Sequence, residues 1–335
     1  HSFAAVGQSP SAMASWATSG ARASVSLSRS RASWNAFRAV TLEVDGQPAH
    51  PRIARTGALL APWPVAVGSG LLILDLGNWY RFYKLFTHFR WESPMSIGSY
   101  LLTIFTLIAF AYAYAWLPEE WRQQLFARVP ANWKQLHRLN VDLSVHRKTL
   151  AMVGFPFAIG VGIYTGVLLG AVSARPFWNT NLVAQMFLFS ALSSGTAALL
   201  LALVLDKRNP VEQRDLKFLV WLDVIFISLE LFIILPYLIH GQLSVLAVKQ
   251  ALWLILGGPY TFVFWVCFLG FGLLVPLGIE VYELAPSLLK GRPFHGSRHL
   301  ALTAAGLVLF GGFLLRYIFV YAGQLSSFHK MGLLH

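Results

Sequence analysis

The sequence predicts an all-α integral membrane protein, built as a multi-span helical bundle. Of its 335 residues, 56% are hydrophobic and only 12% are charged, and the mean hydropathy is +0.58. Soluble domains carry about 25% charged residues, so this composition favours a chain that lipid largely surrounds. The apolar residues also form stretches long enough to cross a membrane, which takes roughly 20 residues per helix.

Seven stretches reach this length, and each is expected to be one transmembrane helix: 57–76, 97–117, 150–174, 183–205, 218–239, 259–281 and 299–322. Prolines within them are tolerated where neighbouring helices satisfy the freed backbone groups. The stretch 245–258 is amphipathic and about half as long, so an interfacial or re-entrant helix is expected there. The bundle is therefore predicted over residues 56–325, followed by a short tail at 326–335.

Residues 1–55 differ in kind from the rest of the chain. Ser, Ala and Arg dominate them, and no acidic residue precedes Glu43. This composition is typical of a transit-like or disordered segment. A misassigned start is the alternative, since the chain begins with His.

The net charge of +12 comes from bases in the loops between the apolar stretches. They are interpreted as topology signals and contacts with anionic lipids, not as a nucleic-acid surface. Side X is defined here as the side reached at the end of the first span, and it carries six bases: Arg81, Lys84, Arg90, Arg175, Lys249 and Lys330. Side Y carries thirteen: Arg122, Arg128, Lys134, Arg138, Arg147, Lys148, Lys207, Arg208, Arg214, Lys217, Lys290, Arg292 and Arg298. The excess predicts that side Y is cytoplasmic and that the 77–96 loop faces outward.

Cysteine and histidine usage limits the redox chemistry of the chain. The single cysteine, Cys267, excludes a disulfide framework and a four-cysteine iron–sulfur cluster within it. The ten histidines fall in loops or at span ends, so no pair is placed to ligate a membrane haem. Neither haem nor metal is expected, and any electron must arrive on a diffusible ligand and leave through a partner protein.

Ionisable side chains inside spans are costly and usually functional. Asp75 and Arg316 both lie toward side X, where they can pair across helices as a structural clamp or as part of a site. Asp223 and Glu230 are seven residues apart, which places them on one helix face. They are candidates for a proton path, although neighbouring hydroxyls can equally satisfy them. Glu280, near the Y end of its span, is the remaining buried acid.

Aromatic residues gather toward side X, as expected for the interfacial belt of a membrane protein. Tyr164 is an exception, because it lies about ten residues before the X end of the 150–174 stretch. A buried phenol needs a hydrogen-bond partner. Beside a carboxylate and an arginine, a tyrosine hydroxyl can bind a quinone carbonyl, so Tyr164 is a candidate site residue.

Four segments, in this order, resemble the NrfD/polysulfide reductase membrane-subunit (PsrC-like) family. They are "LDLGNWYRF", "SPMSIGSYLL", "YTGVLLGAVSARPFWNTNLVAQMFLFSALSSGTAALL" and "LLRYIFVYAGQ". The resemblance covers about residues 52–325. It implies a bundle typically of eight spans, of which seven are readable here; the position of the family's first helix falls in the Ser/Arg-rich segment.

The resemblance also implies the function. The chain would oxidise or reduce a quinone, either menaquinone or ubiquinone, near the outer face of a bacterial inner membrane. It would exchange electrons with an iron–sulfur subunit that serves a large catalytic subunit, typically molybdenum-dependent. The implied and candidate quinone-site residues are Asp75, Arg81, His88, Tyr164, Arg175, Trp178 and Arg316.

Two other functions remain open from the sequence. A transporter or ion channel predicts discontinuous helices with polar groups at mid-membrane, whereas here only Glu230 and the serines Ser190, Ser193 and Ser194 interrupt an apolar middle. A passive membrane anchor without a working quinone site is the third possibility. The terminal substrate and the direction of electron flow are not encoded in any motif of this chain.

Overall fold

The computed structural model describes residues 50–75, 83, 93–127, 143–172, 174–206, 211–289, 291, 293–294 and 296–326. Six helical spans in this part are long and apolar enough to cross a membrane. They are α5 (Pro94–Trp116), α8 (Arg147–Gly170), α9 (Leu182–Leu205), α10 (Gln213–Leu243), η4 (Val263–Leu274) continued by α12 (Val275–Leu289), and α13 (Arg298–Leu325). The predicted all-α membrane fold is confirmed, and these six correspond to the last six predicted spans.

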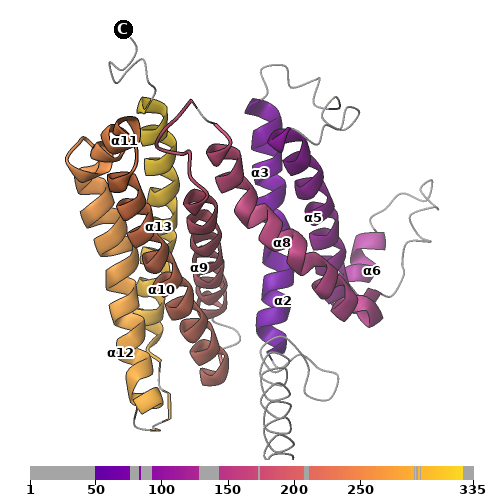
Figure 1. The fold of residues 1–335 in the computed structure, drawn as a ribbon. Coiled ribbons are helices and arrows are strands. Elements are labelled where there is room, and N and C mark those ends of the chain that lie inside the picture. Colours follow the sequence, from indigo (N-terminus) through magenta and orange to yellow (C-terminus); the bar gives the residue numbers. More distant parts are fainter. Residues whose placement is uncertain are drawn as a thin grey trace, which may run out of the picture. The chain divides into compact units, whose positions relative to one another are not determined.

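The first predicted span is divided into two consecutive helices, α2 (Pro51–Leu60) and α3 (Pro62–Asp75). The break follows from Pro62 and Pro64, which have no backbone N–H to continue the helical ladder. The N–H of Ala61 still donates to the carbonyl of Gly57 at 2.9 Å. Figure 1 shows α3 continuing from α2, so the chain keeps its direction through the prolines.

Short features complete the local structure. The Ser-Pro-Met-Ser segment begins a helix: the Oγ of Ser93 caps α5 by accepting the N–H of Ser96, and Pro94 occupies the first turn. The half-length stretch is the short helix α11 (Leu246–Leu256). Two small helices, α6 (Glu119–Ala127) and the 3₁₀ turn η3 (Leu143–His146), flank the loop between α5 and α8.

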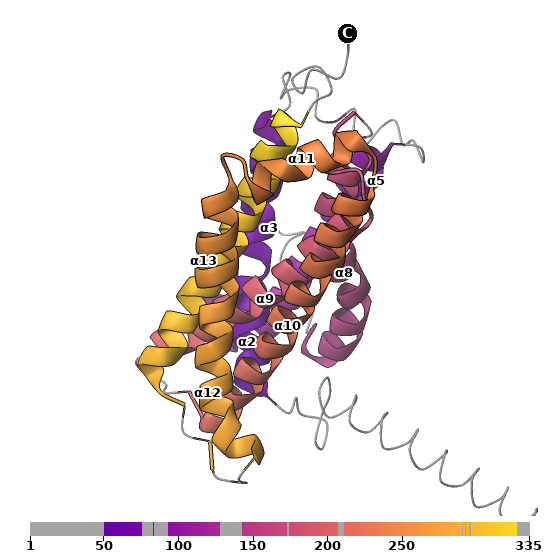
Figure 2. The ribbon, with the colours of Figure 1, turned by 60° about the vertical axis from the view of Figure 1, so that its left-hand side comes forward.

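The spans pack as two groups that meet between α8 and α9 (Figures 1 and 2). The first group is α3, α5 and α8, in which α5 packs against both of the others. The second group is α9, α10, η4, α12 and α13, and α11 packs on α10 and α13. From the chain direction, the X ends include the end of α3, the start of α5, the end of α8 and the end of α13.

Within the second group, η4 and α13 approach closely at two glycines. The Cα atoms of Gly272 in η4 and Gly311 in α13 meet where a Cβ on Gly272 would lie 2.6 Å from the Gly311 Cα. Small residues let helices in lipid approach to this distance, and the closer contact strengthens van der Waals packing. The π-helical turn of η4 lies at this crossing.

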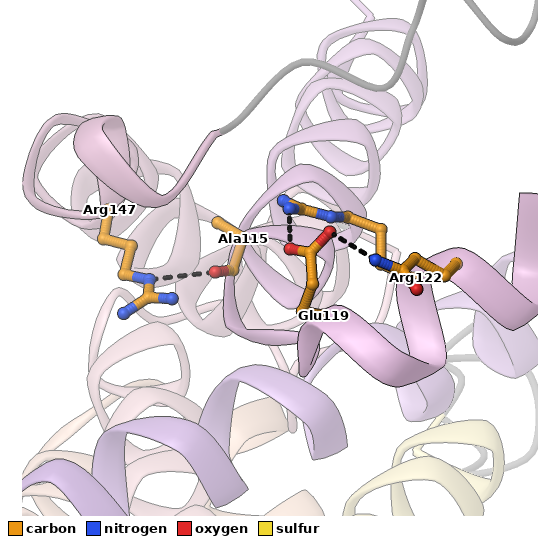
Figure 3. Close-up of polar contacts among 5 residues, drawn as sticks. Ala115, Glu119, Arg122 and Arg147 are labelled. Carbon is orange, nitrogen blue, oxygen red and sulfur yellow. Dashed lines mark hydrogen bonds and ion pairs between the residues drawn. The ribbon is translucent and has the colours of Figure 1, made fainter.

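On side Y, an arginine joins the end of α5 to the start of α8 (Figure 3). The Nε of Arg147 donates to the carbonyl of Ala115 at 2.8 Å, and its guanidinium lies 4.5 Å from the ring centroid of Trp116. Glu119 and Arg122 form an ion pair on α6 beside it. One carbonyl that the end of α5 cannot satisfy internally is thus bound by the next span.

Candidate functional site

Tyr164, on α8, packs directly on Gly98 in the second turn of α5. A Cβ at Gly98 would overlap the Cε2, Cζ and hydroxyl of Tyr164, so only glycine lets the phenol ring lie there. The Tyr164 side chain is half-buried. The contact brings a tyrosine hydroxyl against the helix start that the Ser-Pro-Met-Ser segment forms.

The Tyr164 side chain points away from the second group of helices. Gly162 and Gly166, two residues to either side on α8, face Leu188 and Ala184 of α9. Residues two apart on a helix point to nearly opposite sides, because each residue turns the helix by about 100°. Tyr164 therefore faces α5, and α8 lies between its phenol and α9.

Three predicted residues lie at or after the end of α3. Asp75 is the last residue of α3, at the X end of the first group, and its side chain lies outside the described residues. Arg81 and His88 also lie outside the described part of the chain. By chain direction, the end of α3, the start of α5 and the last two turns of α8 are all at side X.

Arg175 and Trp178, in the loop between α8 and α9, both bind the X end of α13. The indole Nε1 of Trp178 donates to the carbonyl of Phe319 at 2.6 Å, and the ring lies over Gly323. The guanidinium of Arg175 donates to the carbonyl of Gln324. These two hydrogen bonds connect the loop between α8 and α9 to the last turns of α13.

A buried aromatic cluster lies beneath this loop. Phe177 packs against Phe319 and Tyr237, with ring centroids 5.2 and 6.1 Å apart. The hydroxyl of Tyr237 donates to the carbonyl of Phe177 at 3.1 Å. None of the predicted quinone residues lines the small hollow nearby, whose lining is Pro176, Phe177, Asn179, Thr180, Tyr237, His240, Gly241, Val248 and Leu252.

Both predicted proton-path acids, Asp223 and Glu230, point into the second group. Asp223 is fully buried, and its Oδ1 accepts the hydroxyl of Ser193 on α9 at 2.8 Å. Its carboxyl also lies in hydrogen-bonding contact with that of Glu280 on α12. Glu230 is 1% exposed and lies beside Ser190 of α9.

Arg316 completes this polar interior from α13. Its guanidinium donates to the carbonyl of Gly312 at 2.7 Å and lies 6.0 Å from the ring centroid of Phe187. It is also close enough to Glu230 for their charges to attract. Among the described carboxylates, Glu230 is near enough for its charge to attract Arg316; the sequence paired this arginine with Asp75, whose side chain is not described.

The arrangement provides two chemical environments. The first group presents a phenol near side X, and the second encloses the carboxyls of Asp223, Glu230 and Glu280 together with serines and Arg316. Sequence reasoning identified Asp223, Glu230 and Arg316 individually but missed the contact of Glu280 with Asp223. The available signal was the occurrence of Glu280 inside a span, which gave its depth but not its partner.

Comparison with known proteins gives consistent matches along most of the sequence. The sequence profile of the family described as "Polysulphide reductase, NrfD" matches residues 32–327. The protein is similar to "Protein NrfD" of Escherichia coli, 30% identical over 281 residues, which cover 82% of this sequence and 83% of that protein. It is similar to one of the chains of the polysulfide reductase of Wolinella succinogenes, 32% identical over 275 residues covering 81% and 82%.

A third relative belongs to a different reductase. It is a subunit of the selenate reductase of Mesobacillus selenatarsenatis, 27% identical over 259 residues, which cover 72% of this sequence and 61% of that protein. The family profile begins at residue 32, so the match extends into the Ser/Arg-rich segment, ahead of the described helices.

Proposed function

The chain belongs to the NrfD polysulphide reductase family, and from this premise we propose that it is the quinone-reactive membrane subunit of a respiratory oxidoreductase complex. It is a multi-pass membrane protein. Two relatives are named as single components of reductases, which supports a role within a larger complex. In this role the chain exchanges electrons between the quinone pool and another subunit.

The electrons and the protons released from a quinol leave the site by different routes. A quinol that becomes a quinone releases two electrons and two protons. Because this chain has a single cysteine, the electrons pass to an iron–sulfur partner, which transfers them to a large, molybdenum-dependent catalytic subunit. Quinone reduction is the same exchange in reverse.

The quinone headgroup binds at the X end of the first group. The Tyr164 hydroxyl donates a hydrogen bond to a quinone carbonyl, and the Asp75 carboxylate accepts a hydrogen bond from a quinol hydroxyl. Arg81 and His88, which follow Asp75 in the chain, also bind the quinone, while Arg175 and Trp178 form the rim. The contact of Tyr164 with Gly98 is the observation that carries this assignment, because it holds a phenol against the first turns of α5, toward side X.

Protons follow a separate route through the second group. Asp223 and Glu230 carry them along α10 between side Y and the membrane interior, and Arg316 balances the charge of Glu230. Buried carboxyls on one helix face are suited to this role, since charges inside a membrane are otherwise strongly disfavoured.

The complex lies in the bacterial inner membrane with side Y in the cytoplasm, as the loop charges indicate. The 77–96 loop then faces the periplasm. The iron–sulfur subunit docks over that loop, within reach of the quinone site.

The test is reduction of the purified complex by menaquinol and ubiquinol analogues. Tyr164→Phe and Asp75→Asn should each lower kcat/KM by roughly tenfold or more, because a lost hydrogen bond to a polar ligand is worth about 1–3 kcal/mol. Tyr282→Phe is the control, since that tyrosine on α12 is 76% exposed.

Other outcomes point to the rival functions. Unchanged activity in both variants would show that the quinone binds elsewhere. Absence of any quinol-dependent reduction in the wild-type complex would favour a passive anchor. Activity that requires an ion gradient and no quinol would favour transport.

A further inference from the structure

We infer that Glu280, Asp223 and Glu230 form a continuous proton path that opens on side Y, and that the Asp223–Glu280 pair holds one shared proton. The inference deepens the proposed proton route of Asp223 and Glu230 and rests on it. It adds a member, Glu280, which lies on another helix, and assigns the side of the membrane from which protons enter.

The shared proton follows from hydrogen-bonding capacity. An ionised carboxylate only accepts hydrogen bonds, so two carboxyls in hydrogen-bonding contact need a proton between them. Asp223 and Glu280 are in such contact and are 0% and 2% exposed. The described neighbour that donates to the pair is the hydroxyl of Ser193.

Unsatisfied polar atoms mark the rest of the path. Among the described residues, seven buried side-chain nitrogen or oxygen atoms have no hydrogen-bond partner. Five of them belong to residues of the neighbouring helices α9, α10 and α12: Glu283 Oε2, Glu280 Oε2, Asp223 Oδ2, Ser190 Oγ and Glu230 Oε1. Buried polar atoms are nearly always paired, with protein or with water. The carboxyl oxygens of this cluster therefore need a proton shared between neighbours, or bound water, to complete their hydrogen bonds.

The path opens toward side Y. Glu280 lies nine residues before Leu289, the Y end of α12, a distance of about 14 Å along the helix. Glu283 is one turn closer to that end, where its Oε1 accepts the N–H of Ser297 at 2.7 Å. Lys217 of α10 donates to Ser287 of α12 at 2.6 Å nearby, so cationic and anionic groups flank the opening.

At the inner end, the proton passes from the pair to Glu230. Ser190 and Ser193 lie one turn apart on α9 and line the interval between Asp223 and Glu230. The carboxylate of Glu230 becomes a carboxylic acid, and Arg316 loses its anionic neighbour. The pair, left with two carboxylates, takes up a proton from side Y through Glu283. No electron moves in this step.

The first measurement needs no quinone. Infrared spectroscopy of the purified complex should show a protonated-carboxyl band that shifts in heavy water. Glu280→Gln should remove this band, and its amide N–H can still donate to Asp223, so the fold is retained. Glu212→Gln, at an exposed position before α10, is the matched control and should leave the band unchanged. Asp223→Asn is the second variant, with the same expected loss.

The second measurement uses the complex in sealed vesicles, with a pH-sensitive dye on one side and a quinol analogue as reductant. Glu280→Gln should lower proton exchange with side Y at least tenfold, while electron transfer with an uncoupler present stays near the wild-type rate. A carboxyl band that persists in both variants overturns the shared proton. Wild-type proton exchange in Glu280→Gln overturns the path. If the wild-type complex does not oxidise quinol at all, the proposed function is wrong. The infrared test of the shared proton does not depend on that outcome.

Discussion

The two groups of spans differ in how completely they enclose their residues. In the first group, only 22% of an 18-residue apolar stretch of α5 is buried inside the protein, and 11% of the equivalent stretch of α8. In the second group, the corresponding shares are 39% for α9 and α10 and 50% for α13. Lipid or a partner must cover the first group, whereas the second covers its own interior.

This difference matches the two kinds of ligand proposed for them. A quinone is itself a lipid-soluble molecule, and it can reach Tyr164 on a thinly packed group directly from the membrane. Protons and water need an interior closed to lipid, which the second group provides around Asp223 and Glu230. Substitutions in the second group should therefore affect stability first, and those in the first group should affect quinol binding.

The largest expected effect is on stability, from removing the charge that faces Glu230. Arg316→Met should destabilise the protein by about 2–3 kcal/mol, because Glu230 loses a nearby cation and the carbonyl of Gly312 loses a charged hydrogen-bond donor. The double variant Arg316→Met with Glu230→Gln should recover most of this loss. Thermal unfolding in detergent measures both variants. Equal stability of the single and double variants would mean that Arg316 and Glu230 do not interact.

A second effect on stability should come from the helix crossing within the second group. Gly272→Ala should destabilise by about 1–3 kcal/mol, because its Cβ would lie 2.6 Å from the Cα of Gly311 and backbone must move. Gly278→Ala is the control on the same span, where no described atom lies within 4 Å of the added Cβ. Equal unfolding temperatures for the two variants would contradict tight packing at this crossing.

The fold was largely predictable, because apolar length alone fixes the spans of a membrane protein. The start of α5 was also predictable, since Ser93 and Pro94 are a strong cap and first-turn pair. The division of the first span into α2 and α3 could not be predicted from the sequence alone. Pro62 and Pro64 were recognised, but lipid-embedded helices often continue through prolines, so their presence did not decide the break.

The site was less predictable than the fold. A helix that is hydrophobic all round gives no periodic signal of which face is buried. The spacing of Asp223 and Glu230 placed them on one face, but nothing in the sequence set the rotation of α12 that brings Glu280 to Asp223. The same limit applies to Gly98, whose contact with Tyr164 depends on how α5 and α8 pack.

In the first group the corresponding test is functional. Gly98→Ala should raise the KM for quinol by roughly tenfold, because a Cβ there displaces the Tyr164 phenol, and tenfold equals about 1.4 kcal/mol of lost binding. Gly306→Ala is the control, since no described atom lies within 4 Å of its added Cβ. Steady-state kinetics with a quinol analogue provide the measurement.

A double variant distinguishes positioning from a general packing defect. If Gly98 acts through the phenol, Gly98→Ala should have little further effect on KM in a Tyr164→Phe background, since contacting residues show non-additive effects. Additive effects of the two substitutions would show that Gly98 does not position Tyr164.

The smallest expected effect concerns Trp178, which joins the two groups at side X. Its Nε1 donates to the carbonyl of Phe319, so Trp178→Phe should lower stability by about 0.5–1.5 kcal/mol, the net value of one hydrogen bond. Trp253→Phe, at a 61% exposed position on α11, is the control. Because the indole N–H is already bound to α13, quinol KM should change less than twofold. A larger rise in KM, with unchanged stability, would mean that the indole contacts the quinone directly and that the rim lies closer to the headgroup than the α13 contact implies.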